Sequence, residues 1–144
     1  MITRNWTRAA NLSALAALAA ASLSFAAAAH AADFDGSKTL LCAPGEAIDC
    51  VPRGDCMQAS PGQLGIPRFL TVDFGAKRLS GKTAEGELHT AIQNVQSLDG
   101  KQILQGAEGG RGWSIVIDEQ TGDMSAAVAD QSAGFLVFGA CTPK

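Results

Sequence analysis

The chain has 144 residues, of which 17% are charged and 47% hydrophobic, and its formal net charge is −3. This length favours one domain. Binding to nucleic acids or to anionic membranes depends on clustered Lys and Arg, so the acidic balance argues against both classes of partner.

Residues 1–31 have the pattern of a secretory signal peptide. Arg4 and Arg8 precede an apolar stretch rich in Ala and Leu, which ends at Ala29-His30-Ala31, a small-residue cleavage motif. We therefore expect a periplasmic or secreted protein in which residues 32–144 form one domain. No later apolar run approaches the ~20 residues of a membrane-spanning helix, so no span is expected.

All four cysteines follow the predicted signal peptide: Cys42, Cys50, Cys56 and Cys141. An even number in an exported chain predicts two disulfides, for which three pairings are open. We favour a local Cys50–Cys56 loop, which leaves Cys42–Cys141 to join the first and last predicted strands. A zinc site is the alternative, but no C-x2-C spacing occurs, so no metal is expected.

The predicted domain begins with a strand at residues 39–43 and then changes character. Residues 44–67 contain four prolines and four glycines and keep neither a helical nor a strand period. Irregular loops of this length are uncommon in small domains and are usually functional or held by a cross-link. We expect the inner disulfide to hold this one.

After Pro67 the sequence alternates between strand-like runs and turn residues. Asp99-Gly100 is the clearest hairpin signal, since both central positions of a type I′ turn need positive φ. Within the strand at 112–118, Trp113, Ile115 and Ile117 share one face. The predicted strands of this region are 68–74, 78–80, 87–95, 101–107, 112–118, 124–128 and 135–141.

About eight strands with hairpin-length connections predict an all-β fold, an antiparallel up-and-down meander. A small barrel is preferred over a two-sheet sandwich. If the first and last strands pair, the sheet closes and Cys42–Cys141 lies at the seam of the barrel. Closure would also remove exposed sheet edges.

Few residues suggest catalysis. His89 is the only histidine after residue 31, and Glu87 or Ser80 would be its partners in acid–base chemistry. We favour a solvent-facing strand position for His89. The acidic segment 118–123 offers oxygen ligands for calcium but lacks the spacing of an EF-hand loop, so we interpret it as a turn. No cofactor is expected.

Trp113 is the only tryptophan after residue 31. On the face that it shares with Ile115 and Ile117 it is expected to anchor the core. In a barrel, the same inward face would line a small apolar cavity, and this reading stays open.

Two segments carry a resemblance: Gly134-Phe135 followed by Val137 to Thr142, and Gly112-Trp113-Ser114 continued to Thr121-Gly122. Through them, most of residues 38–143 resembles small exported bacterial proteins of unknown function. The size and the meander are also similar, more loosely, to calycin-type barrels and periplasmic lysozyme inhibitors. The resemblance implies an extracytoplasmic, disulfide-linked β protein and brings no site residues.

The sequence therefore favours a non-enzymatic binding module that engages a protein partner or a small apolar ligand. The expected contact surface is the loop 44–67, because loops carry function on rigid β scaffolds. Its candidate contact residues are Arg53, Asp55, Met57 and Arg68. The alternatives are a hydrolytic or isomerising enzyme that uses His89 and a structural subunit of an exported assembly.

Overall fold

The computed structural model describes residues 33–144, so the predicted signal peptide, residues 1–31, lies outside the described residues. This part of the chain holds ten strands and one 3₁₀ helix, η1 (Pro61–Leu64). The strands are β1 (Leu40–Cys50), β2 (Cys56–Ala59), β3 (Leu70–Asp73), β4 (Arg78–Thr83), β5 (Gly86–Ala91), β6 (Asn94–Leu98), β7 (Lys101–Glu108), β8 (Arg111–Asp118), β9 (Asp123–Ala129) and β10 (Gly134–Pro143). The predicted all-β antiparallel meander is confirmed.

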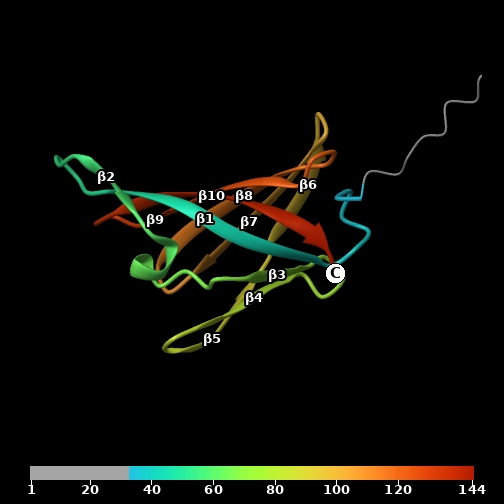
Figure 1. Cartoon of the computed structure of the whole chain (residues 1–144), viewed down its shortest axis with the longest axis horizontal. Coiled ribbons are helices and arrows are strands. Elements are labelled where there is room, and N and C mark those ends of the chain that lie inside the picture. The colour runs from blue at the N-terminus through green and yellow to red at the C-terminus, as the bar shows by residue number, and fades with distance from the viewer. Residues whose placement is uncertain (1–32) are drawn as a thin grey trace, which may run out of the picture.

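The strands form one sheet in the order β5-β4-β3-β1-β10-β9-β8-β7-β6, with β2 added to β1. The sheet curls strongly into a half-barrel (Figure 1). The first and last strands do pair, but they lie in the middle of the sheet. The expectation that their pairing closes a barrel is therefore wrong, and the seam lies between the two ends of the sheet, where β5 and β6 are the edge strands.

Two residues, Ile92 and Gln93, carry the chain across this seam. The Ile92 N–H donates to the carbonyl of Lys77 on the β4 side at 2.9 Å, and the Gln93 N–H donates to the carbonyl of Gln105 on β7 at 2.8 Å. The crossing brings β5 beside β7. It also divides the single strand predicted at 87–95 into β5 and β6.

The segment predicted as an irregular loop at 44–67 contains the second half of β1, the strand β2 and the helix η1, which corrects that expectation. β1 continues past Pro44 to Cys50 and pairs with β10, with a register irregularity between Pro44 and Glu46. β2 then folds back on the second half of β1. Proline lacks an N–H and is tolerated at such irregularities, and pairing with the long β10 outweighs the local composition.

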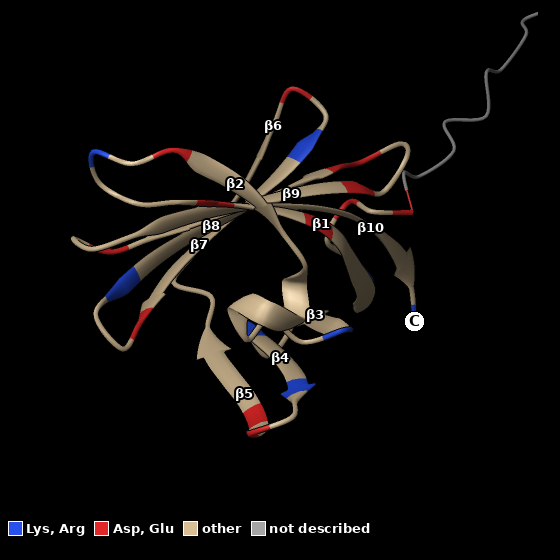
Figure 2. Ribbon diagram, turned by 60° about the vertical axis from the view of Figure 1, so that its left-hand side comes forward, with Lys and Arg blue, Asp and Glu red and all other residues tan. Residues whose placement is uncertain are grey.

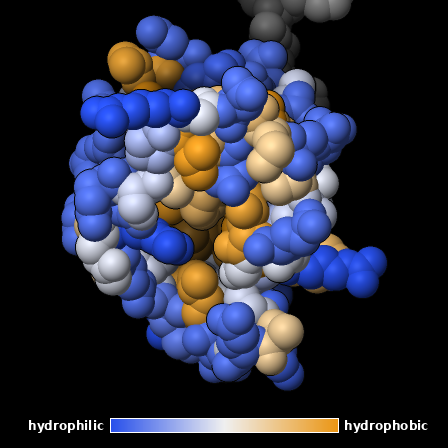
Figure 3. Space-filling view, turned by 90° about the vertical axis from the view of Figure 1, so that its left-hand side faces the viewer, coloured by the Kyte–Doolittle hydropathy of each residue, from blue (hydrophilic) through white to orange (hydrophobic). Residues whose placement is uncertain are grey.

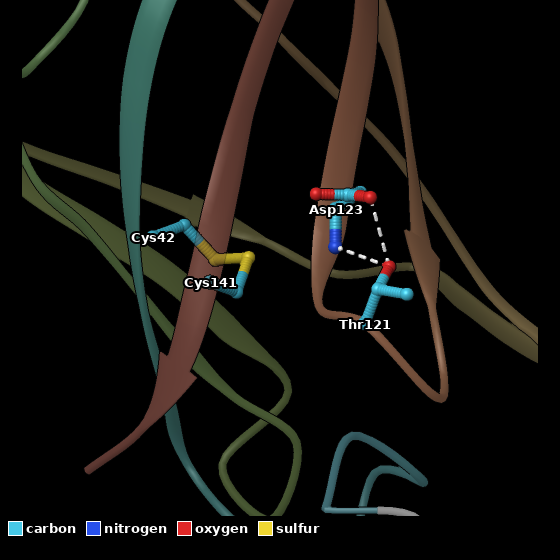
Figure 4. Close-up of a disulfide and its surroundings, with 4 residues drawn as sticks. All are labelled: Cys42, Thr121, Asp123 and Cys141. Carbon is cyan, nitrogen blue, oxygen red and sulfur yellow. Dashed lines mark hydrogen bonds between the residues drawn. A yellow bond between two sulfur atoms is a disulfide. The ribbon is translucent and has the colours of Figure 1, made fainter.

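Both disulfides join the favoured cysteine pairs. Cys42 and Cys141 are partners in the β1–β10 register (Figure 4), and Cys50 and Cys56 are partners in the β1–β2 hairpin. Two disulfides indicate an oxidising, extracytoplasmic environment. The longer cross-link fastens the centre of the sheet instead of its seam.

One end of the half-barrel is filled. Leu40, Leu104 and Ile117 are fully buried there. The segment 33–38 covers this end. Its Phe34 ring packs so closely on Gly122 that a Cβ at Gly122 would lie 2.5 Å from the ring.

Gln102 fixes the covering segment to the sheet. This side chain belongs to a residue that is only 3% exposed, and its Nε2 donates to the carbonyl of Asp35 at 3.0 Å and to Glu119 Oε1 at 2.6 Å. Because a buried amide needs its hydrogen bonds, Gln102 ties the position of residues 33–38 to β7.

Within residues 33–144, no helix is long and apolar enough to cross a bilayer.

Candidate functional site: an apolar cavity at the open end of the half-barrel

The opposite end of the half-barrel is hollow. Figure 3 looks into it and shows apolar side chains around a depression, with polar groups surrounding them. The cavity measures about 810 Å³. Its inner wall is formed by the inward faces of three neighbouring strands, which contribute Trp113 and Ile115 from β8, Ala126 from β9, and Phe135 and Val137 from β10. The side chains that the alternation along β8 and β9 predicts to point inward therefore line a cavity at this end of the half-barrel.

A second wall comes from the segment that follows η1. Leu64, Ile66 and Pro67 line the cavity. Pro67 rests on β4 at Gly81, where a Cβ would lie 2.6 Å from the proline ring and 2.8 Å from the carbonyl of Phe69. Glycine at position 81 is therefore what lets this wall approach the sheet. Part of the predicted functional loop does reach the site.

Trp113 lies where the cavity meets the seam. Its indole N–H donates to Thr90 Oγ1 on β5 at 3.2 Å, and Thr90 is only 7% exposed. The ring covers Gly106 on β7, which has no side chain to obstruct it. Trp113 packs against the core and also lines the cavity, so the two readings of this residue both hold.

The rim of the cavity is charged and mainly acidic. It includes Glu85, Glu87, Glu108 and Asp130 and one arginine, Arg111. Figure 2 shows that charged residues gather at the turns between strands. Arg111 Nε lies 3.1 Å from Asp130 Oδ2 and forms an ion pair with it. A ligand that enters therefore passes a rim with a surplus of negative charge.

Asp130 organises the turn between β9 and β10. Its Oδ1 accepts hydrogen bonds from the hydroxyl and N–H of Ser132 and from the N–H of Ala133. The Ser132 hydroxyl and N–H, followed by Arg111, hold the pKa of the Asp130 carboxyl well below its usual range. The carboxylate is thus a permanent negative charge at the rim.

His89 stands on the outer face of β5 at the margin of the cavity. Its Nε2 lies 3.1 Å from Glu87 Oε2, and both side chains are more than half exposed. Ser80 is its neighbour in the β4–β5 register. Among the described residues, Glu87 is the only hydrogen-bond partner of the His89 side chain. A nucleophile, a base and an orienting group are therefore not connected here.

The acidic segment 118–123 stabilises a turn. Asp118 Oδ1 accepts the N–H groups of Gln120 and Thr121, while Oδ2 bonds to Lys101 at 2.6 Å. Lys101 above all, with the two N–H groups, lowers the pKa of Asp118 well below its usual range. Within residues 33–144, no three potential metal ligands converge.

The four residues favoured for binding lie outside the cavity. Arg53 and Asp55 are in the β1–β2 turn, and Met57 is 67% exposed on β2. The Arg68 guanidinium lies over the Phe69 ring, 5.9 Å from its centre. None of the four is among the described residues that line the cavity. Their role in a contact surface stays a prediction.

The sequence did not predict Thr90 and Gly106 as residues of the site, and within the predicted contact loop it favoured other residues than the wall at 64–67. One signal was present. Gly106 and Trp113 occupy paired positions in the predicted hairpin around Gly109-Gly110, and the pairing of the smallest and the largest residue indicates a ring lying across a strand.

No protein-family model matches the sequence, and no curated protein matches it significantly. The resemblance to small exported bacterial proteins therefore stays a prediction.

Proposed function

We propose that the protein is a non-enzymatic extracytoplasmic binding module, periplasmic or secreted, that holds an apolar group in the open end of its half-barrel. The group belongs to a small ligand or to a partner protein. The observation that carries the proposal is the cavity of about 810 Å³ lined by Trp113, Ile115, Ala126 and Val137. Concave, largely apolar sites with few polar groups are where proteins bind small molecules.

Three features support binding over catalysis. Within residues 33–144, the one hydrogen-bonded pair at the cavity margin that could move protons is His89 and Glu87, and it lies on the outer face of β5. The polar group that reaches the cavity beside Trp113 is a threonine hydroxyl already engaged by the indole. The disulfides and the covered closed end fix the walls in advance, which lowers the entropic cost of binding.

A fluorescence titration with the neutral apolar probe N-phenyl-1-naphthylamine tests the proposal. We expect probe emission to rise and saturate with the oxidised protein. Ala126→Leu adds volume inside the cavity and is expected to weaken binding about tenfold. Ala127→Leu adds the same volume to the exposed outer face of β9 and is the matched control.

The proposal is wrong if the probe does not bind, or if both leucine variants bind it equally. Circular dichroism of each variant shows whether it is folded. The extracytoplasmic part has a separate test, the intact mass of the exported protein. It is expected to begin at Ala32 and to carry two disulfides, and a mass that retains residues 1–31 contradicts that part.

A further inference from the structure

β5 has a free edge that faces the cavity. It pairs with β4 on one side, and the described residues place no strand against its other side at this end. The Ile92 N–H points to β4, and backbone groups alternate along a strand. Thr90 and Leu88 therefore also turn their backbone groups to β4, and Glu87 and His89 turn theirs outward, toward the seam.

The strand across the seam, β7, pairs with β8 on one side, but its other side, which faces the seam, has no partner near the rim among the described residues. The pairing of β6 with β7 ends at Asn94 and Gln105, so Gly106 to Glu108 extend beyond it. β5 and β7 come closest where a Cβ at Gly106 would lie 2.6 Å from the carbonyl of Ala91. From there toward the rim, the cavity lies between them, bounded by residues 85–89 on one side and 108–109 on the other.

The surroundings of this gap combine three kinds of recognition. Backbone donors and acceptors lie along the β5 edge. Apolar side chains, among them Leu88 and Trp113, lie beneath it, and carboxylates stand at the rim on both sides, at Glu87 and Glu108. An unpaired sheet edge next to an apolar cavity is the arrangement that accepts an added strand.

We propose that an extended peptide segment of a partner protein binds in this gap as an additional strand on β5. Its alternate side chains are apolar and enter the cavity, and basic residues between or beside them meet the acidic rim. This inference rests on the proposed function, because it names the occupant of the same cavity. Backbone hydrogen bonds to Glu87 and His89 supply affinity, and the cavity supplies specificity.

Calorimetric titration with a synthetic peptide of about eight residues, in which valine and lysine alternate, tests the inference. We expect it to bind, and we expect the valine–glutamate analogue to bind at least about tenfold more weakly. Methylation of the backbone nitrogens on one edge of the lysine peptide is expected to lower affinity by a similar factor. Methylation on the opposite edge is expected to have a smaller effect.

Proline substitution in the protein tests the same contact from the other side. His89→Pro removes an outward N–H from β5 and is expected to abolish peptide binding, since proline is accepted on edge strands but blocks a further strand. Val95→Pro is the matched control. The two-residue turn at Asp99-Gly100 makes Leu98 and Lys101 a hydrogen-bonded pair. Alternation along β6 then turns the Val95 N–H outward, so this variant removes an outward N–H from the other edge strand and is expected to leave peptide binding unchanged.

The outcomes separate the inference from the proposed function. If N-phenyl-1-naphthylamine binds but the lysine peptide does not, the cavity is a binding site and the added strand is wrong. If the peptide binds regardless of methylation on either edge, strand addition is also wrong. If neither compound binds, both proposals fail. Should His89→Pro not fold, the methylated peptides still decide.

Discussion

Trp113 on β8 and Thr90 on β5 are joined by a hydrogen bond of 3.2 Å. In the sheet, five other strands lie between β5 and β8. The bond closes the seam of the half-barrel through side chains, beside the point where Ile92 and Gln93 close it through the backbone. It thereby sets where the filled part of the interior ends and the cavity begins.

Breaking this bond from either side is expected to be costly. Trp113→Phe leaves the largely buried Thr90 hydroxyl without its donor, and Thr90→Val leaves the indole N–H without an acceptor, each lowering the free energy of unfolding by about 1–3 kcal/mol. The double variant is expected to lose less than the sum, with a coupling of about 1 kcal/mol. Urea unfolding measures all four proteins, and strict additivity would show that the bond contributes nothing.

Gly106 is expected to tolerate no side chain. Gly106→Ala places a methyl group against the Trp113 ring and 2.6 Å from the Ala91 carbonyl, so the seam must widen. Overpacking of this kind costs about 1–3 kcal/mol. Gly112→Ala, on the paired strand with nothing within 4 Å of the added Cβ, is the control and is expected to be neutral or slightly stabilising. Equal melting temperatures for the two variants would contradict the close contact.

The two disulfides are expected to differ in their effect on stability. Cys42 and Cys141 are 99 residues apart and Cys50 and Cys56 only 6. In the chain-entropy model, the first cross-link contributes about 5 kcal/mol and the second about 2 kcal/mol. Paired Cys→Ala variants compared by chemical denaturation measure both, and a larger loss from the short loop would argue against that ordering.

Acid is expected to destabilise the fold through Asp118 and Asp130. Both folded-state pKa values lie below the ordinary value near 3.8, so the unfolded chain takes up protons first as the pH falls. Their contribution is therefore complete above about pH 5 and is lost as the pH falls toward the folded-state values. We expect Asp130→Asn to be less stable than the wild type at pH 7 and the difference to narrow below about pH 4. The urea midpoints of both proteins across this pH range test the prediction. A difference in stability that does not change with pH would contradict the lowered pKa of Asp130.

The fold class could be predicted from the sequence because strand alternation and turn formation depend on residues that are neighbours in the chain. Asp99 and Gly100 both adopt the positive φ that their hairpin requires, and Trp113, Ile115 and Ile117 share the inward face as predicted. Local signals failed at β1, where pairing with β10 extends the strand through a proline-containing segment. That pairing joins residues about ninety positions apart, and composition holds no information about it.

The cavity could not be predicted for a related reason. Its position depends on which sheet ends meet, and that is settled by the two-residue crossing at Ile92 and Gln93. The sequence gives these residues no distinguishing feature. Glycines at 81 and 106 admit Pro67 and the Trp113 ring, but their purpose is visible only once their neighbours are known.

The most direct test of the binding cavity is a nuclear magnetic resonance titration of the ¹⁵N-labelled, oxidised protein with N-phenyl-1-naphthylamine. We expect the shifted signals to include the Trp113 indole N–H and the amides of Ala126 and Val137. The amides beside Met57 and beside Phe138, which is 42% exposed on the outer face, are expected to stay in place. Shifts confined to the β1–β2 hairpin or to the outer face of β10 would contradict binding in the cavity.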